Sequence, residues 1–394
     1  MNFAAYQSLF QTQKAPFAWV DLDALDDNIQ TIAERAKGKN IRLATKSIRC
    51  RFILSYILDK LPYSFGLMSF TIEESIWLAE KGFANILLGY PCFEIELIEK
   101  VVSNPQLNSA ICFMVDGLEH VEILNQTATK CQTKANICVD VDMSMHFPGI
   151  YFGVYRSSIQ TIRDLENLLE KTKDFANVSW KGMMGYEAQI AGVGDNFPKN
   201  TLMNGIVRYL KRKSLPKIAQ RRAECLAVFK NKGIELQFVN GGGTGSIEST
   251  LKEKAITEIT VGSGFFQSHL FDNYTNFTHR PAVFYALRIV RNPKTHVFTA
   301  LGGGYIASGA TDSNKQPQPF WPDGMKLIKN EGAGEVQTPF EYRGKIPLKV
   351  GDLVFFRHAK AGELCERFNE LILVRNGKIE QIVPTYRGEQ KSFL

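Results

Sequence analysis

Short apolar runs alternate with longer stretches of helical periodicity over the first two thirds of the chain. The apolar runs predict buried strands, and the helical stretches between them are typical of β/α units around a parallel sheet. Nine such runs occur, at 17–22, 41–46, 64–70, 84–90, 110–115, 136–141, 180–186, 236–242 and 258–264. If the first strand pairs elsewhere, the other eight form an α/β fold, a (β/α)₈ TIM-like barrel over about residues 41–275.

Two helical stretches carry recognisable end signals or periodicity. In "TIEESIWLAEKG" (71–82), Thr71 is a candidate N-cap, Glu74 completes a capping box and Gly82 ends the helix. In residues 157–173, apolar side chains recur at three- and four-residue spacing, which predicts a second helix.

The pattern changes near residue 280. Runs such as "AVFYALRIVR" and "NELILVRNGKIEQIV" favour strands, and "RNGK" (375–378) is typical of a hairpin turn. The stretch 302–345 is rich in glycine and proline, as binding loops or disordered segments are. We therefore expect a barrel domain over 1–280 and a C-terminal all-β domain over 281–394, which the first strand joins.

Composition and charge narrow the class of protein. The 394 residues are 44% hydrophobic and 22% charged, as in ordinary globular proteins. The net charge is +7 and the basic residues are scattered, with the densest cluster, "RYLKRK", at 208–213. A solvated helix face explains this cluster better than a nucleic-acid site, and a mild positive field favours small anionic substrates.

Cysteine usage and the N-terminus bear on location. The seven cysteines are odd in number and show no C-x-x-C pair, which favours reduced thiols in a cytoplasmic protein. The N-terminal stretch lacks the pattern of a signal peptide, and no apolar run approaches the roughly 20 residues of a membrane span. We therefore expect neither a membrane nor a nucleic acid as partner.

Lys46 stands at the end of the apolar run "IRLATK", the position where barrels carry catalytic groups. An isolated lysine there usually just reaches water, but two glycine-rich segments change this interpretation. "VNGGGTGS" (239–246) and "TVGSGFF" (260–266) follow the seventh and eighth barrel strands, where barrels most often hold a phosphate. Their glycines could instead only form tight turns. A strand-end lysine opposite a phosphate cradle suits pyridoxal phosphate, whose aldehyde forms a Schiff base with an amine.

Further candidates lie on the same rim or in the β-rich part. The segment "GMMGYEAQIAG" (182–192) brings Tyr186 and Gln189 there as candidate cofactor contacts. Tyr186 is also a candidate catalytic residue, with core packing as its other interpretation. Its Glu187 is either solvated or functional. His358, in a dense polar cluster, is a candidate base or substrate contact, a structural histidine, or a metal ligand with Cys365 at an unrecognised spacing.

These motifs together resemble a known group. "FAWVDLDALDDNI", "LATKS", "GYEAQ", "NGGGTGS" and "TEITVGSG" resemble the fold-type III pyridoxal-phosphate enzymes with an alanine racemase-like barrel. More narrowly, the chain is similar to the D-serine dehydratase and D-threonine aldolase branch, often labelled amino acid deaminase/aldolase. The resemblance covers nearly the whole chain, because "HAKAGELCERFNEL" lies where that branch carries a C-terminal motif.

The resemblance implies Lys46 as the Schiff-base lysine, and around the phosphate it implies Gly241, Gly242, Gly243, Thr244, Gly262 and Ser263. It also implies a head-to-tail homodimer in which the partner's β domain caps each site. Metal-dependent members carry a histidine, one residue, then a cysteine or aspartate; here His358 is followed by Lys360. An ammonium cannot ligate a cation, so we expect no divalent metal by this route, although Glu363 or Cys365 could substitute.

The expected activity is a pyridoxal-phosphate-dependent lyase that acts on a D-amino acid with a β-hydroxyl, as dehydratase (deaminase) or aldolase. Lys46 would be the base at Cα, and His358 would handle the hydroxyl. One alternative is an amino acid racemase, which needs a second base such as Tyr305 from the partner. Others are a non-catalytic carrier of the cofactor, which would need no large β domain, and a sugar-phosphate barrel enzyme without cofactor.

Overall fold

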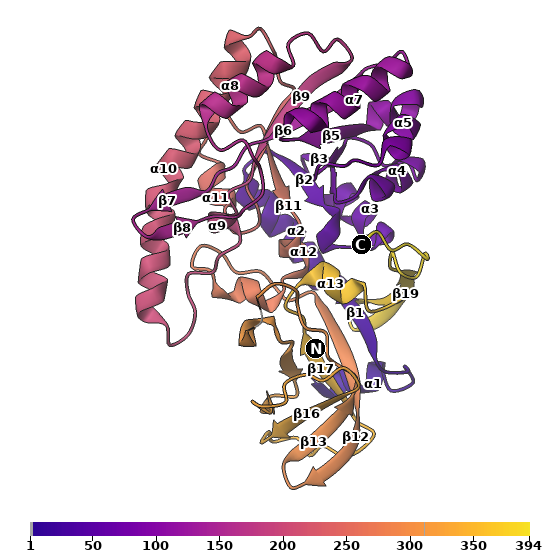
Figure 1. Cartoon of the computed structure of the whole chain (residues 1–394). Helices are drawn as coiled ribbons and strands as arrows, with labels where there is room; N and C mark the ends of the chain where they lie inside the picture. Colours follow the sequence, from indigo (N-terminus) through magenta and orange to yellow (C-terminus); the bar gives the residue numbers. More distant parts are fainter. Residues whose placement is uncertain (1–2, 311) are drawn as a thin grey trace.

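The computed structural model describes residues 3–310 and 312–394; residues 1–2 and residue 311, which falls in the stretch 302–345, lie outside the described part. A barrel surrounded by helices occupies the upper part of Figure 1, and a β-rich region occupies the lower part.

The eight expected barrel strands all form, and the predicted (β/α)₈ barrel is confirmed. The strands are parallel and close as β2 (Asn40–Ala44), β3 (Ser64–Ser69), β4 (Ile86–Leu88), β5 (Ile111–Val115), β6 (Ala135–Asp140), β9 (Val178–Gly185), β10 (Phe238–Gly241) and β11 (Glu258–Val261). Closure comes from β11 pairing with β2, where Val261 lies opposite Leu43.

Helices cover the outside of the barrel. The longer ones are α2 (Leu22–Ala36), α3 (Arg51–Lys60), α4 (Ile72–Glu80), α5 (Ile95–Ser103), α6 (Pro105–Ala110), α7 (Leu118–Lys130), α8 (Ile162–Lys171) and α10 (Thr201–Asn231). Short helices follow the strand ends, namely η1 (Thr45–Ser47), α9 (Ala188–Ala191), α11 (Ile247–Thr250), α12 (Ser263–Phe266) and η2 (His269–Asn273). A small hairpin, β7 (Met145–Phe147) and β8 (Ile150–Phe152), follows β6. Among the described residues, no helix combines the length and apolar character that a bilayer span requires.

Helix ends follow the capping residues. Thr71 accepts a hydrogen bond from the Glu74 amide at 3.2 Å, as expected, but the Glu74 carboxylate accepts from the amide of Phe70 instead of that of Thr71. The helix predicted from residue 157 starts only at Ile162. The reason is a complete capping box between Thr161 and Asp164, which fixes the first turn there. The basic cluster 208–213 lies on the predicted helix, α10, but not all of it is solvated, because Lys211 is buried and bonds Asp195 at 3.1 Å.

The second region is a nine-stranded sheet. Its main path runs β15 (Met325–Leu327), β16 (Gln337–Tyr342), β13 (Val297–Leu301), β12 (Val283–Lys294), β1 (Phe17–Asp21), β18 (Glu370–Arg375) and β19 (Lys378–Pro384). β17 (Leu353–Arg357) pairs with β12 and β14 (Gln318–Trp321). The first strand, β1, thus lies between β12 and β18. Helix α1 (Phe3–Leu9) precedes β1 in the chain, and α13 (Ala361–Cys365) follows β17.

Two expectations for this region have different outcomes. "RNGK" does form the hairpin turn between β18 and β19, with Asn376 and Gly377 at φ of 47° and 71°. The stretch 302–345 is not irregular throughout, because β14, β15, β16 and η3 (Ser313–Lys315) lie in it. Its glycines and prolines separate short strands, which sequence patterns detect poorly.

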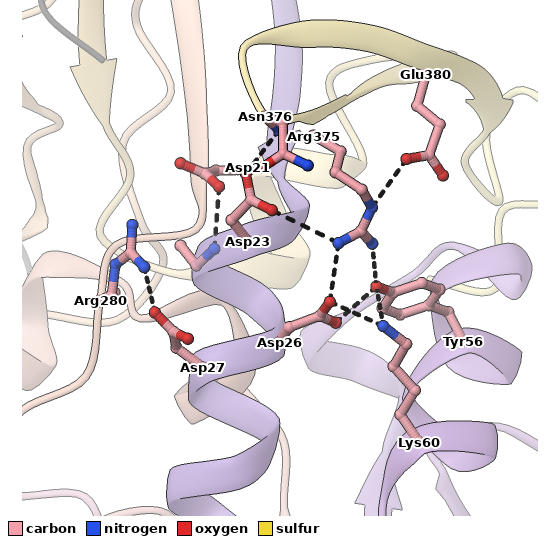
Figure 2. A network of polar contacts seen from close by, with 11 residues as sticks. Asp21, Asp23, Asp26, Asp27, Tyr56, Lys60, Arg280, Arg375, Asn376 and Glu380 are labelled. Atoms are coloured by element: carbon pink, nitrogen blue, oxygen red, sulfur yellow. Dashed lines mark hydrogen bonds and ion pairs between the residues drawn. The ribbon is translucent and has the colours of Figure 1, made fainter.

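A polar seam connects the barrel helices to the last hairpin. Figure 2 shows Arg375 of β18 reaching Asp26 of α2, at 2.9 Å, while Lys60 of α3 reaches the same carboxylate at 2.8 Å. The amide of Asn376 donates to Asp23 at 2.7 Å. Because these charges lie on α2, α3 and the β18–β19 turn, they fix the hairpin against the outside of the barrel.

The barrel interior contains a buried ion pair beneath the strand ends. Arg42 of β2 and Glu258 of β11 are both 0% exposed and form two hydrogen bonds, of 2.7 and 2.9 Å. Arg42 also donates to the carbonyls of Leu67 and Asn85. The pair links the strands that close the barrel, and its donors are satisfied, as a buried charge requires.

We expect Arg42→Met to lower the free energy of unfolding by about 3–5 kcal/mol, because it leaves the Glu258 carboxylate buried without its charge partner. Urea titration of both proteins measures the change. The double variant Arg42→Met with Glu258→Leu removes both charges and should recover part of the loss. A double variant less stable than the single one would contradict this explanation.

Candidate active site

A cavity of about 180 Å³ opens at the carboxyl ends of the barrel strands. Its floor consists of inward-facing side chains near those ends, namely Ala44, Met68, Asp140, Met184, Asn240 and Thr260. Its rim includes Lys46, Ser47, Tyr90, Arg156, Ser157, Tyr186, Gly242, Gly243, Thr244, Gly262 and Ser263. Asn240 bonds both Thr260 and Glu258 at 2.7 Å, so the buried ion pair supports the floor from below.

Lys46 reaches this cavity because β2 ends at Ala44 and the chain turns into η1. Its Nζ donates to the hydroxyl of Tyr90 at 2.8 Å. Tyr90 follows β4 and lies on the rim. Burial would raise the pKa of Tyr90, but the Lys46 ammonium outweighs it and lowers that pKa. Lysine and tyrosine thus form one polar pair at the mouth.

Two glycine loops, defined as residues 240–246 and 262–264, contribute to the lining of the same cavity as Lys46. The amides of Thr244 and Ser263 have no hydrogen-bond partner within the described residues. The hydroxyls of Ser47 and Ser263 lie 3.1 Å apart, and Thr244 Oγ1 accepts from the Gly264 amide at 3.0 Å. These amides and hydroxyls are hydrogen-bond donors, the chemistry that a phosphate monoester needs.

Space as well as chemistry fits such an anion. A Cβ added at Gly243 would lie 3.0 Å from that of Ala191, and one added at Gly262 would lie 2.7 Å from the Ser47 hydroxyl. Gly242 has φ +76°, which other residues rarely adopt. Side chains at these positions would crowd the protein's own atoms, so the loops keep this path as glycines. A lysine amine together with free amide and hydroxyl donors on one cavity fits the aldehyde and the phosphate of pyridoxal phosphate.

Behind the first glycine loop lies a fully buried carboxylate. Glu187 Oε1 accepts from the hydroxyls of Ser246 and Thr250, at 2.7 and 2.6 Å. Its Oε2 accepts from the amide of Gly242 at 3.0 Å and from Arg222 of α10. Burial alone would raise the pKa of Glu187, but Arg222 and the hydroxyl donors hold it below its ordinary value. The sequence leaves Glu187 either solvated or functional, and its burial shows that the first of these interpretations is wrong.

Asp140 is an acid on the cavity floor that sequence reasoning missed. Burial, with repulsion from Asp116 next, raises the pKa of Asp140 to about 7. Arg156, on the rim, opposes this shift and lies over the ring of Tyr186, with 5.8 Å from its Cζ to the ring centroid. Asp140 can therefore exchange a proton near neutral pH.

The predicted site residues do not all line the cavity. Lys46, Tyr186, Gly242, Gly243, Thr244, Gly262 and Ser263 do. Gly241 lies one step deeper, where a Cβ would lie 2.9 Å from the Arg222 guanidinium. Gln189 is buried behind the rim and donates to the carbonyl of Met143, while burial raises the pKa of Tyr186 to about 12.

His358 is also absent from the lining. It is 1% exposed, its Nδ1 lies 3.1 Å from the carbonyl of Val283, and its Nε2 has no partner among the described residues. Burial, with Arg357 next, lowers the pKa of His358 to about 3, so the ring is neutral. Its catalytic role stays a prediction.

The C-terminal motif does not offer a metal-binding set. Lys360 Nζ donates to the Ser308 hydroxyl at 2.8 Å and to the Glu363 carboxylate at 3.2 Å. Glu363 is thus already engaged, and burial raises the pKa of Cys365, which keeps the thiol neutral. No group of three or more metal-ligating side chains gathers in residues 3–310 or 312–394. That no divalent metal binds by this route stays a prediction, supported by the pairing of Lys360 with Glu363.

The sequence analysis does not identify Asp140, Tyr90 and Arg156 as site residues, because the cavity lining is assembled from segments far apart in the sequence. A signal was present for the first: in "NICVDV", alternation places Asp140 on the inner face at a strand end. Tyr90 is the last residue of the run 84–90 that is predicted as a strand, but the strand ends at Leu88, so alternation along the run does not give its side-chain direction. Arg156 lies after the β7–β8 hairpin, which no pattern predicted.

Known proteins share this architecture over nearly the full chain. A 3-hydroxy-D-aspartate aldolase from Paracoccus denitrificans is 22% identical over 380 residues, which cover 94% of this chain and 91% of that protein. The structure of D-threonine aldolase from Filomicrobium marinum matches with a TM-score of 0.79 at 17% identity, covering 96% of each chain. D-threo-3-hydroxyaspartate dehydratase from Delftia sp. HT23 matches at 0.75 and 14% identity, covering 96% of this chain and 98% of that one.

These structural likenesses show the fold, and a family model shows more. Residues 20–268, well over half of the chain, match the model described as alanine racemase, N-terminal domain. That range contains all eight barrel strands, Lys46 and both glycine loops. The chain therefore belongs to the alanine racemase N-terminal domain family.

Proposed function

We propose that this protein is a pyridoxal-phosphate-dependent lyase that acts on a D-amino acid carrying a β-hydroxyl. The observation that carries the proposal is the convergence of Lys46 and the two glycine loops on one cavity. The relatives support the substrate class, since their names refer to D-threonine and to D-3-hydroxyaspartate, both 3-hydroxy amino acids of D configuration.

Lys46 would hold the cofactor covalently through Nζ, while the amides of Thr244 and Ser263 and the hydroxyls beside them would bind its phosphate. When bound, the cofactor supplies an electron sink for negative charge that develops at Cα of the substrate. Lys46, once its amine is free, is the base within reach of the Cα proton, and Tyr90 orients that amine through their 2.8 Å hydrogen bond.

The two outcomes differ in where a proton moves. A dehydratase needs an acid that protonates the leaving β-hydroxyl, and an aldolase needs a base that removes the hydroxyl proton before the Cα–Cβ bond breaks. Asp140 lines the cavity and can do either near neutral pH, whereas His358 lies behind the lining. We therefore assign the hydroxyl proton to Asp140 in preference to His358.

A homodimer and a cytoplasmic location are part of the proposal. Exposed apolar side chains gather on the start of α10, with Leu202 at 81% and Met203 at 51%, and Tyr155 beside the cavity mouth is 84% exposed. Apolar groups of this size in water favour burial by a second copy. Tyr305, the candidate racemase base, packs edge-on against Tyr285 and Phe368 of its own chain.

Incubation with D- and L-forms of serine, threonine and 3-hydroxyaspartate tests the function directly. We expect turnover of D-isomers only, with either a keto acid and ammonia or glycine and an aldehyde as products. Appearance of the opposite isomer, without those products, would identify a racemase instead. A loaded protein that turns over none of the six amino acids would favour the carrier.

The lysine assignment has its own test. Purified protein loaded with pyridoxal phosphate should absorb at the edge of the visible range, and borohydride should fix the cofactor mass on the peptide that contains Lys46. Lys46→Ala should lose turnover by on the order of a thousandfold or more, because it removes a reacting group, while thermal stability changes little. Cofactor fixed on another lysine would reject the assignment.

The buried carboxyl of Asp140 predicts a free energy of unfolding that falls as the pH rises. Because the pKa of Asp140 is about 7 in the folded protein and lower in the unfolded chain, folding binds a proton. Its contribution to stability is complete at pH 4 and is lost as the pH rises through 7. Asp140→Asn should therefore add about 1–3 kcal/mol at pH 8 and little at pH 4. Equal effects at both pH values in urea titrations would contradict this.

A further inference from the structure

We propose that Glu187 is a positioning residue that holds the first glycine loop in the shape that receives the cofactor's phosphate. The inference rests on the proposed function for the identity of the ligand. Glu187 does not line the cavity, so it acts through the loop and not on the ligand.

The Glu187 carboxylate accepts hydrogen bonds from the first glycine loop, directly and through Ser246. The Gly242 amide donates to it directly, and the Gly243 amide donates at 3.0 Å to Ser246 Oγ, whose own proton goes to Glu187. Two successive amides are thereby turned away from the cavity. The amide of Thr244, the next in the chain, has no partner among the described residues and is left for the ligand.

A chain of contacts connects the first glycine loop to the neighbour of Lys46. Thr244 Oγ1 accepts from the amide of Gly264, and Ser263 of that second loop lies against Ser47, the neighbour of Lys46. A shift of the first loop therefore moves the phosphate cradle relative to the amine. Glu258 contacts this loop only through the side chain of Asn240 at its start, and Glu253 bonds a different nitrogen of Arg222, at 2.5 Å.

Only an ionised carboxylate satisfies this set of donors. Four donors share two oxygens, two on each. A glutamine has one oxygen and one NH₂. With the NH₂ toward Gly242 and Arg222, two donors lose their acceptor; with the NH₂ toward Ser246 and Thr250, it donates to their oxygens and their hydroxyl protons lose the carboxylate. Since a buried donor without a partner is costly, the loop must move. Glu187→Gln is thus a nearly isosteric change that disturbs the loop specifically.

The test compares two ligands that differ only in the phosphate. Full-length apoprotein, as wild type, Glu187→Gln and Glu253→Gln, is titrated with pyridoxal 5′-phosphate and with pyridoxal, following absorbance. We expect Glu187→Gln to bind the phosphorylated compound about 10- to 100-fold more weakly and pyridoxal within about threefold of wild type. Glu253→Gln, which alters the same arginine but no loop donor, should leave the ratio of the two affinities unchanged.

Each other outcome decides the question. Unchanged binding by Glu187→Gln, or equal losses for both compounds, would overturn the positioning role while leaving the proposed function standing. Wild-type protein that binds neither compound would overturn the proposed function itself. If Glu187→Gln does not fold, Thr250→Val removes one hydroxyl from the same carboxylate and should produce a smaller loss with the same selectivity; a loss shared by both compounds would then reject the role.

Discussion

The pairing of β11 with β2 is the constraint on which the site depends. It joins the last barrel strand to the first, so the residues that follow each strand come to the same place although more than half of the chain separates them. Lys46 follows β2, and Gly262 and Ser263 follow β11. Their meeting needs no special attraction between them, because hydrogen bonds of the closed sheet fix their separation.

Buried charge supports this arrangement at two levels. The Arg42–Glu258 pair lies in the barrel interior across the closing strands, and Arg222–Glu187 lies behind the first glycine loop. Both pairs are almost completely excluded from water, where unpaired charges would be very costly. At these two points charged side chains replace apolar ones in the interior. Their directional hydrogen bonds orient the groups they contact, which van der Waals packing alone does not do.

Sequence patterns predicted the barrel because its strands are continuous apolar runs separated by amphipathic helices, and both periods are local properties. They also identified Lys46 and the glycine loops, whose positions at strand ends can be counted. Asp140 and Tyr90 escaped because the direction of a side chain at a strand end depends on register and closure. For Glu187 the sequence leaves two interpretations, solvated or functional, because its partners come from α10 and α11 and no local pattern indicates such a meeting. The strands within 302–345 were missed because each has six residues or fewer and proline interrupts two of them.

The location of β1 has a consequence for biosynthesis. β1 is synthesised before every barrel strand, yet its two neighbours, β12 and β18, are made after the last of them. Until β12 and β18 are made, the backbone N–H and C=O groups of β1 lack their sheet partners, although all eight barrel strands have already been synthesised. An edge of this kind is open to wrong partners. The nascent chain therefore contains all eight barrel strands while β1 is still available to other strands, and only the synthesis of β12 and β18 encloses it.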